Sequence, residues 1–239
     1  MDTAEPAIAV IAAEARELSG LVAHATAVTA LNWPVRYALE AEIAGRRWLL
    51  LANGAGASLA QQAAEAALER APVRALVSTG LCGALHPALE TCDIIAATEV
   101  TQPSPAIGCF PAAQPAPSPG ARMTGPVVCS PRVASTPEEK AVLHASGAIA
   151  VEMEAAGVAA AAARAQLPFY CIKGVSDTAA EALPLDFNRY RDPAGRFQPG
   201  RIAAAALAHP VRLPSLARLA RASHQASLKL GDFLAACHF

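Results

Sequence analysis

The sequence predicts an α/β fold with a mixed, mostly parallel central sheet flanked by helices. Two observations lead to this prediction. Short apolar runs alternate along the chain with Ala- and Leu-rich stretches of helical spacing, and several of the apolar runs end in glycine or in an acidic residue. No repeat or shift in composition divides the 239 residues, so we expect a single domain over residues 1–239.

Each element follows from its local pattern. Compact apolar runs predict buried strands, in chain order, at residues 7–12, 47–52, 75–79, 93–100, 126–129, 148–151 and 169–175. Apolar residues at helical spacing predict helices at residues 14–21, 58–70, 137–144, 199–208 and 215–235. Residues 102–125 carry many prolines and little periodicity, which predicts a long surface loop, and residues 178–196 form a second irregular stretch.

Composition limits the classes of function. Hydrophobic residues make up 54% of the chain, but the densest run, residues 155–163, is too short to span a bilayer, so we expect no stable membrane insertion. Acids at Asp2 and Glu5, without a basic segment, indicate no signal peptide and hence a cytoplasmic location. The net charge is −1 and no Lys/Arg cluster occurs, which argues against a nucleic-acid partner. The six cysteines lack metal-ligand spacing, so we expect no metal site.

Two acidic motifs carry most of the functional information. The segment Val151-Glu-Met-Glu-Ala-Ala156 follows one predicted strand, and Gly174-Val-Ser-Asp177 ends the next. We expect both strands to deliver their acids to the carboxyl edge of the sheet, where open α/β sheets bind ligands.

The residue types in these motifs fit cleavage of an N-glycosidic bond. We expect Glu154, at the start of a helix, to stay ionised and to accept hydrogen bonds from the two hydroxyls of a ribose. Partial burial makes Asp177 a candidate general acid for a departing base. The residues alone leave a simpler alternative open, in which Glu154 caps a helix and Asp177 caps a turn.

Together the motifs resemble the signature of the nucleoside phosphorylase/nucleosidase superfamily, in particular its 5′-methylthioadenosine/S-adenosylhomocysteine nucleosidases. Two further segments resemble that branch in the same order: residues 8–18, and the glycine loop 78–85 followed by Asp93-Ile-Ile. The resemblance covers residues 7–180 and implies the phosphorylase/hydrolase-like three-layer fold, a purine nucleoside as substrate, no cofactor, and a homodimer or larger homo-oligomer. The implied activity is hydrolysis of an adenine nucleoside such as methylthioadenosine or adenosylhomocysteine.

The resemblance also implies roles for individual residues. Asp177 protonates the purine at N7, with Ser176 as its orienting partner, and Glu17 holds the attacking water. Glu154 binds the ribose hydroxyls and Met153 lies against the ribose face. The remaining implied substrate-binding residues are Glu152, Gly80 and Lys173.

The sequence departs from the family pattern at several positions. Ser78 and Leu81 stand where phosphorylases hold phosphate with an Arg and a Ser; this favours water as the nucleophile, although the nucleosidases also have Ser at position 81. Lys173 replaces an Arg, and Val133 or Ala134 stands where a base-stacking Phe is expected. The Pro-rich segment 102–125 replaces the loop that normally covers the substrate.

The chain from Asp192 onward resembles the tail of a branch that includes hopanoid-associated phosphorylases, which act on a nucleoside with a large apolar 5′ group. The apolar face of residues 215–235 either serves such a group or packs on the domain or a second subunit, and we favour packing. Two alternatives to hydrolysis stay open. One is a phosphate-dependent adenosyl-lipid phosphorylase with Arg16 near the phosphate. The other is a non-catalytic nucleoside-binding homologue, which Leu81 and the missing Phe suggest.

Overall fold

The computed structural model describes residues 5–103, 108–116, 119–192 and 195–239. Some sequence predictions lie outside the described residues. They concern Asp2, residues 104–107 and 117–118 of the Pro-rich segment, and residues 193–194 of the C-terminal segment. Within the described residues the strands form an 11-stranded sheet in the order β2-β3-β4-β1-β5-β11-β6-β10-β9-β7-β8. Their bounds are β1 Ala7–Ala12, β2 Ala25–Ala30, β3 Tyr37–Ile43, β4 Arg46–Ala52, β5 Val73–Ser78, β6 Leu81–Ala84, β7 Ile94–Thr101, β8 Phe110–Pro111, β9 Met123–Cys129, β10 Ala150–Glu152 and β11 Phe169–Asp177.

The sheet has two halves that share β11. In the first half β4, β1, β5 and β11 are parallel, and β2 and β3 extend it as antiparallel strands. In the second half β7, β9 and β10 are parallel to one another and antiparallel to β11 or β6. Because β11 pairs with both β6 and β7, the strands β11, β6, β10, β9 and β7 close into a ring. The predicted mixed, mostly parallel sheet is confirmed.

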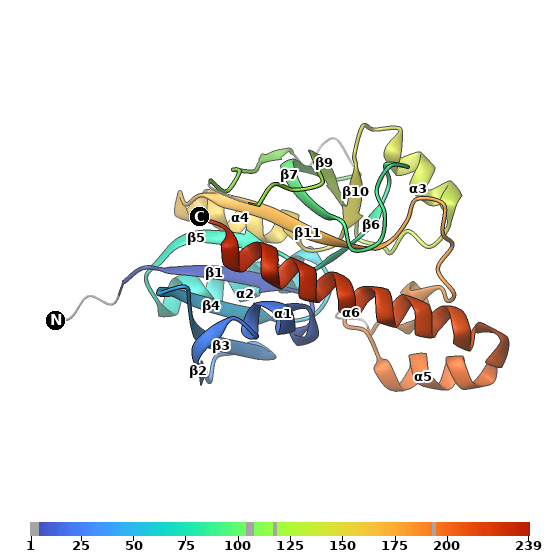
Figure 1. Ribbon diagram of the computed structural model, residues 1–239, viewed down its shortest axis with the longest axis horizontal. Helices are drawn as coiled ribbons and strands as arrows, with labels where there is room; N and C mark the ends of the chain where they lie inside the picture. Colours follow the sequence, from blue (N-terminus) through green and yellow to red (C-terminus); the bar gives the residue numbers. More distant parts are fainter. Residues whose placement is uncertain (1–4, 104–107, 117–118, 193–194) are drawn as a thin grey trace.

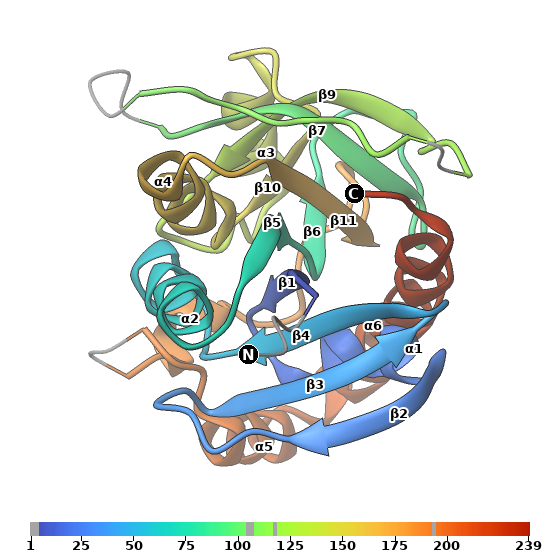
Figure 2. The same cartoon turned by 90° about the vertical axis from the view of Figure 1, so that its left-hand side faces the viewer.

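Helices cover both faces of the sheet. Figure 2 shows α2 and α4 side by side on one face, while α1 and α6 lie on the other. Each face has its own apolar core, one centred on Leu49, Leu76 and Phe169 and one on Ile8, Trp48 and Leu230. The helices are α1 Ser19–Val22, α2 Ala57–Arg70, α3 Pro137–His144, α4 Ala155–Ala165, α5 Pro199–Ala208 and α6 Leu213–Ala236, with short 3-10 turns at Ala15–Leu18, Phe187–Tyr190 and Pro210–Arg212. Among the described residues, no helix is long and apolar enough to cross a membrane.

Most predicted elements are present with ends shifted by a few residues, but some predictions were wrong. The expected helix over residues 14–21 is a 3-10 turn followed by the four-residue α1. Strands β2, β3 and β6 were not predicted from the sequence. Their alanines and glycine make a weak strand pattern, and β2 is largely exposed, so pairing with neighbours rather than local propensity defines these strands.

Two close approaches between helices depend on glycine. A Cβ on Gly157 of α4 would lie 1.8 Å from the carbonyl oxygen of Ala57 in α2, and one on Gly231 of α6 would lie 2.1 Å from the carbonyl carbon of Gly20 in α1. Figure 1 shows α6 running across the molecule from the β5 and β11 region toward α5. The first contact holds the start of α2 against the start of α4, where the first acidic motif lies.

Candidate active site

The first acidic motif divides its two carboxylates between two tasks. Glu152 ends β10 and accepts hydrogen bonds from the backbone amides of Glu154 and Ala155, at 2.9 Å each. Glu154 turns away from the helix: its Oε1 accepts from the amide of Gly56 at 3.0 Å, and its Oε2 from the amide of Met153 at 3.3 Å. The capping role considered for Glu154 therefore belongs to Glu152, because Glu152 binds the first amides of α4.

Lys173 neutralises these acids from inside the protein. Its Nζ lies 2.8 Å from Glu152 Oε2 and 3.7 Å from Glu154 Oε2, and it donates to the carbonyl of Thr79 at 2.8 Å. Burial opposes the charged amine, yet the two carboxylates outweigh burial and raise the pKa of Lys173. The side chain has 0% exposure and its ammonium faces Glu152, Glu154 and Thr79, so a substrate contact of Lys173 stays a prediction. The ammonium stabilises the residues that do line the site.

Burial also changes the charge state of Glu154. Desolvation raises the pKa of this carboxyl to about 7, and Glu152 and Glu17 add to the effect, although Lys173 and the Gly56 amide oppose it. The sequence prediction that Glu154 stays ionised rested on the helix terminus. In the structure its carboxyl accepts from the Gly56 and Met153 amides instead, in a buried position, and its ionisation stays a prediction.

Glu17 projects from the 3-10 turn Ala15–Leu18. Its Oε2 accepts from the amides of Ala13 and Glu14 at 3.0 and 3.1 Å, and burial raises the pKa of the carboxyl despite these bonds and the nearby Lys173 charge. Gly80 lies directly behind it with a φ of +108°, and a Cβ there would be 2.7 Å from Glu17 Oε2. Gly80 was predicted to bind substrate, but it does not line the cavity and instead makes room for Glu17.

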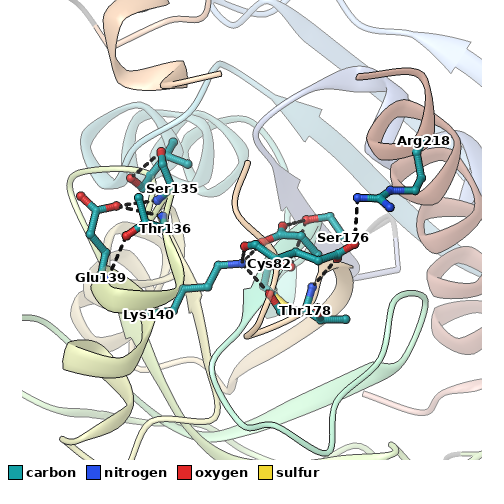
Figure 3. A network of polar contacts seen from close by, with 11 residues as sticks. Cys82, Ser135, Thr136, Glu139, Lys140, Ser176, Thr178 and Arg218 are labelled. Carbon is teal, nitrogen blue, oxygen red and sulfur yellow. Dashed lines mark hydrogen bonds and ion pairs between the residues drawn. The ribbon is translucent and has the colours of Figure 1, made fainter. Parts of the chain in front are cut away.

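Asp177 is the last residue of β11, and both of its oxygens have a partner. Ser176 Oγ donates to Oδ1 at 2.6 Å, as the predicted orienting role requires, and Lys140 Nζ donates to Oδ2 at 2.5 Å. Figure 3 shows the Lys140 side chain reaching from α3 toward Ser176 and Thr178. Sequence reasoning missed Lys140. One signal was available in the sequence. Arg supplies most of the positive charge, and Lys occurs only at positions 140, 173 and 229, so each lysine stands out as an exception.

The two acidic motifs meet for a different reason than the sequence indicated. Strand β10 is antiparallel to β6, with Val151 opposite Gly83, whereas β11 is parallel to β6, with Asp177 opposite the same Gly83. The strands therefore run in opposite directions and do not share a carboxyl edge. The acids converge because β10 and β11 flank the short strand β6, which the sequence did not predict.

A cavity of about 730 Å³ joins these groups, and we call it the site cavity. Its polar wall comes from both motifs and from the 3-10 turn: Glu17, Glu152, Met153, Glu154, Ser176 and Asp177, with Arg16 and Arg132 nearby. The opposite wall is apolar and comes from α5, α6 and the chain before them: Leu183, Phe187, Phe197, Ile202, Ala203, Ala206, Leu216, Leu219 and Ala220.

Two features of the apolar wall modify the sequence predictions. Val133 and Ala134 line the site cavity where a base-stacking Phe was expected, but Phe187 and Phe197 supply aromatic rings from a different segment, 6.4 Å apart between centroids. The N-terminal half of α6 lines the cavity, while its C-terminal half packs on the sheet through Leu230 and Leu234. Packing on the domain thus accounts for only part of this helix.

The fold and these residues define an α/β protein with a cavity that has paired acids on one wall and apolar groups on the other. The family model of the Phosphorylase superfamily matches residues 7–208, and the chain belongs to this superfamily. Among curated proteins no sequence matches the chain.

Solved structures share the fold at low sequence identity. A 5′-methylthioadenosine/S-adenosylhomocysteine nucleosidase from Neisseria meningitidis, in complex with methylthio-immucillin-A, is 21% identical with a TM-score of 0.68, covering 95% of this chain and 99% of that one. The Streptococcus pneumoniae nucleosidase with a transition-state inhibitor is 19% identical with a TM-score of 0.71, covering 96% and 98%. Futalosine hydrolase of Helicobacter pylori is 13% identical with a TM-score of 0.71, covering 96% and 95%. The resemblance expected from the motifs is confirmed at the level of family and fold.

Proposed function

We propose that the protein hydrolyses the N-glycosidic bond of a purine nucleoside, with adenine nucleosides such as methylthioadenosine or adenosylhomocysteine as the substrate class. The observation that carries the proposal is the site cavity, which places Glu17 and Glu154 with Asp177 around one space. Family relatives that the structure resembles include nucleosidases, one of them bound to methylthio-immucillin-A.

The geometry supports a division of roles. Glu154 binds the ribose hydroxyls through its carboxylate, and Met153 lies against the sugar. Asp177, oriented by Ser176, delivers a proton to the purine so that it leaves as a neutral base. Glu17 deprotonates or orients water; burial raises the pKa of its carboxyl, which makes the carboxylate a stronger base. Glu152 holds the first turn of α4 in place.

The nucleophile is assigned to water because Leu81 lines the site cavity where a hydroxyl donor would be needed to hold phosphate. The test is release of free base from methylthioadenosine, adenosylhomocysteine, adenosine and inosine, with and without phosphate. We expect turnover without phosphate. A strict phosphate requirement would instead establish a phosphorylase, with Arg16 and Arg132 as the cationic groups of the cavity.

Asp177→Asn tests the chemistry, and we expect it to lower kcat by ~10²-fold or more because the acid is lost. Full activity of this variant would refute the mechanism. Tight binding of a nucleoside without release of base by the wild-type protein would identify a non-catalytic homologue.

A second candidate substrate is an adenine nucleoside with a large apolar 5′ substituent, as in the adenosyl-lipid alternative. The apolar wall formed by α5 and α6 favours it, because an apolar chain buried there leaves water. Adenosine derivatives with 5′-alkylthio chains of increasing length test this, and we expect KM to fall as the chain lengthens. Leu219→Gln should abolish that trend, whereas Leu228→Gln, at an exposed position on the same helix, should preserve it.

Cytoplasmic location and a homodimer or larger assembly remain parts of the proposal. Light scattering of the purified protein measures the assembly, and a monomer would contradict that part.

A further inference from the structure

Lys140 occupies an unusual place for a lysine. It is the only buried residue of α3, all of which the structure describes, and its side chain is 1% exposed. A helix normally buries apolar side chains, and an ammonium group is buried only when it is paired. The position therefore points to a role for the charge.

The partners of Lys140 Nζ are all oxygen acceptors at the end of β11. They are Asp177 Oδ2 at 2.5 Å, the carbonyl of Thr178 at 2.6 Å and the carbonyl of Glu181 at 2.9 Å. The ammonium has three N–H groups, and each has one acceptor. Asp177 Oδ1 is taken by Ser176, so the carboxylate is held in one orientation from both sides.

The chain around α3 fixes where this lysine points. Thr136 and Glu139 form a capping box at the start of the helix, with Thr136 Oγ1 accepting from the Glu139 amide at 3.2 Å. Glu139 also accepts from the amide of Ser135, whose carbonyl binds the amide of Leu183. Figure 3 shows this capping box and the Lys140 contacts side by side. Lys140 is thus set against the segment that follows Asp177.

An ion pair between Lys140 and Asp177 raises a chemical question. A carboxylate that protonates a leaving purine must first carry a proton. Lys140 Nζ and Ser176 Oγ both donate to Asp177, and of these two groups the ammonium is the stronger acid. Asp177 is 7% exposed and lines the site cavity, whereas Lys140 is 1% exposed and does not line it. The hydrogen bond from Nζ to Oδ2 gives one proton a direct path, and moving that proton from nitrogen to oxygen converts the ion pair into a neutral amine and a carboxylic acid.

We propose that Lys140 is a positioning residue that holds the catalytic proton for Asp177, a proposal that rests on the nucleosidase function proposed above. An N–H bond of the ammonium breaks as an O–H bond forms at Asp177 Oδ2. The carboxylic acid then donates a proton to the purine as the glycosidic bond breaks, which leaves a neutral amine and a carboxylate. Solvent restores the proton after the base departs. The step involves no oxidation or reduction, and it needs no reactant besides the nucleoside and water.

Two substrates with different leaving groups test the proposal. Purines need a proton to leave, whereas the nitrophenolate of p-nitrophenyl β-D-ribofuranoside is a stable anion that leaves without one. We expect Lys140→Met to lower kcat for the purine nucleoside by ~10²-fold or more, with kcat for the nitrophenyl riboside within about threefold of wild type. A merely structural role would lower both rates together, and that result would overturn the proposal.

Lys140→Arg is the second variant, and it separates the charge of Lys140 from its ability to donate a proton. It also serves as the test if Lys140→Met fails to fold. Arg keeps the buried positive charge but does not give up its proton. We expect it to lose purine cleavage and retain nitrophenyl riboside cleavage, and full purine cleavage would overturn the proposal. Lys229→Met, at an exposed position, is the matched control and should behave as wild type. Failure of the wild-type protein to cleave either substrate would refute the proposed function itself, which is a separate outcome.

Discussion

Lys173 and Glu152 form an ion pair in which neither side chain is exposed, with 2.8 Å between Nζ and Oε2. The pair joins the middle of β11 to the end of β10, and Glu154 lies 3.7 Å from the same ammonium. Breaking a buried pair by removing one partner leaves an uncompensated charge, which is far more costly than the pair is stabilising. The acidic wall of the site cavity therefore depends on a residue that does not touch the cavity.

Lys173→Met should destabilise the fold, because Glu152 then loses the cation that lies 2.8 Å from its Oε2. We expect the free energy of unfolding, measured by urea denaturation, to fall by about 3–5 kcal/mol. Lys229→Met removes an exposed charge on α6 and should change it by less than about 0.5 kcal/mol. Equal effects of the two substitutions would show that the ion pair does not stabilise the protein.

Gly157→Ala should separate α2 from α4. The new Cβ would lie 1.8 Å from the carbonyl oxygen of Ala57, so backbone has to move. We expect a loss of about 1–3 kcal/mol in the free energy of unfolding, together with a higher KM, because the Gly56 amide moves away from Glu154 Oε1. Gly200→Ala, in α5 with open space around it, is the control and should leave KM unchanged. A wild-type KM for Gly157→Ala would refute the link between helix contact and site.

Gly80→Ala should displace Glu17. Its Cβ would lie 2.7 Å from Glu17 Oε2, and the φ of +108° is itself unfavourable for alanine by about 1–3 kcal/mol. We expect kcat to fall because the carboxylate no longer meets the attacking water. Gly45→Ala also places alanine at a positive φ, +70°, but has nothing within 4 Å, so it should lower the thermal unfolding midpoint without changing kcat. If both variants lose the same activity, backbone strain rather than displacement of Glu17 is responsible.

The sequence predicted the elements whose signal is local. The apolar runs of β1 and β11 and the helical spacing of α2 and α6 are strong patterns, and all four elements are present. Strand β6 has no such pattern, since Leu-Cys-Gly-Ala is short and contains glycine. Its place is set by pairing with β10 and β11, which lie far away in the sequence, and this is why the meeting point of the two acidic motifs was misassigned.

The site was predicted to the extent that its residues belong to motifs. Glu154, Asp177, Ser176 and Glu17 all reach the site cavity. Lys140 and the Phe187–Phe197 pair were missed because they belong to no motif, and only tertiary contacts bring them to the site. Lys173 was predicted only as a substrate-binding residue, and its buried ion pair with Glu152 was not foreseen, because a strand position does not show which neighbour the side chain faces.

The pKa of Glu154 predicts that stability and substrate binding respond to pH in opposite directions. The pKa of this carboxyl is about 7 in the folded protein, against an ordinary value of 4.5, with Glu152, Glu17 and Lys173 as the charged groups around it. A raised carboxyl pKa adds stability that is fully present below pH 4.5 and is lost as the pH rises through 7. The ionised form is the one that accepts both ribose hydroxyls, so KM should fall over the upper part of the same range.

Glu154→Gln isolates this titration because glutamine is neutral at every pH. Urea denaturation of both proteins between pH 5 and 8 gives the difference in their free energies of unfolding, wild type minus variant. We expect that difference to decrease as the pH rises, by at most about 3 kcal/mol, and the wild-type KM to decrease with it. A difference that is flat or increases with pH would mean that Glu154 is already ionised in the folded protein, and that Lys173 rather than burial sets its charge.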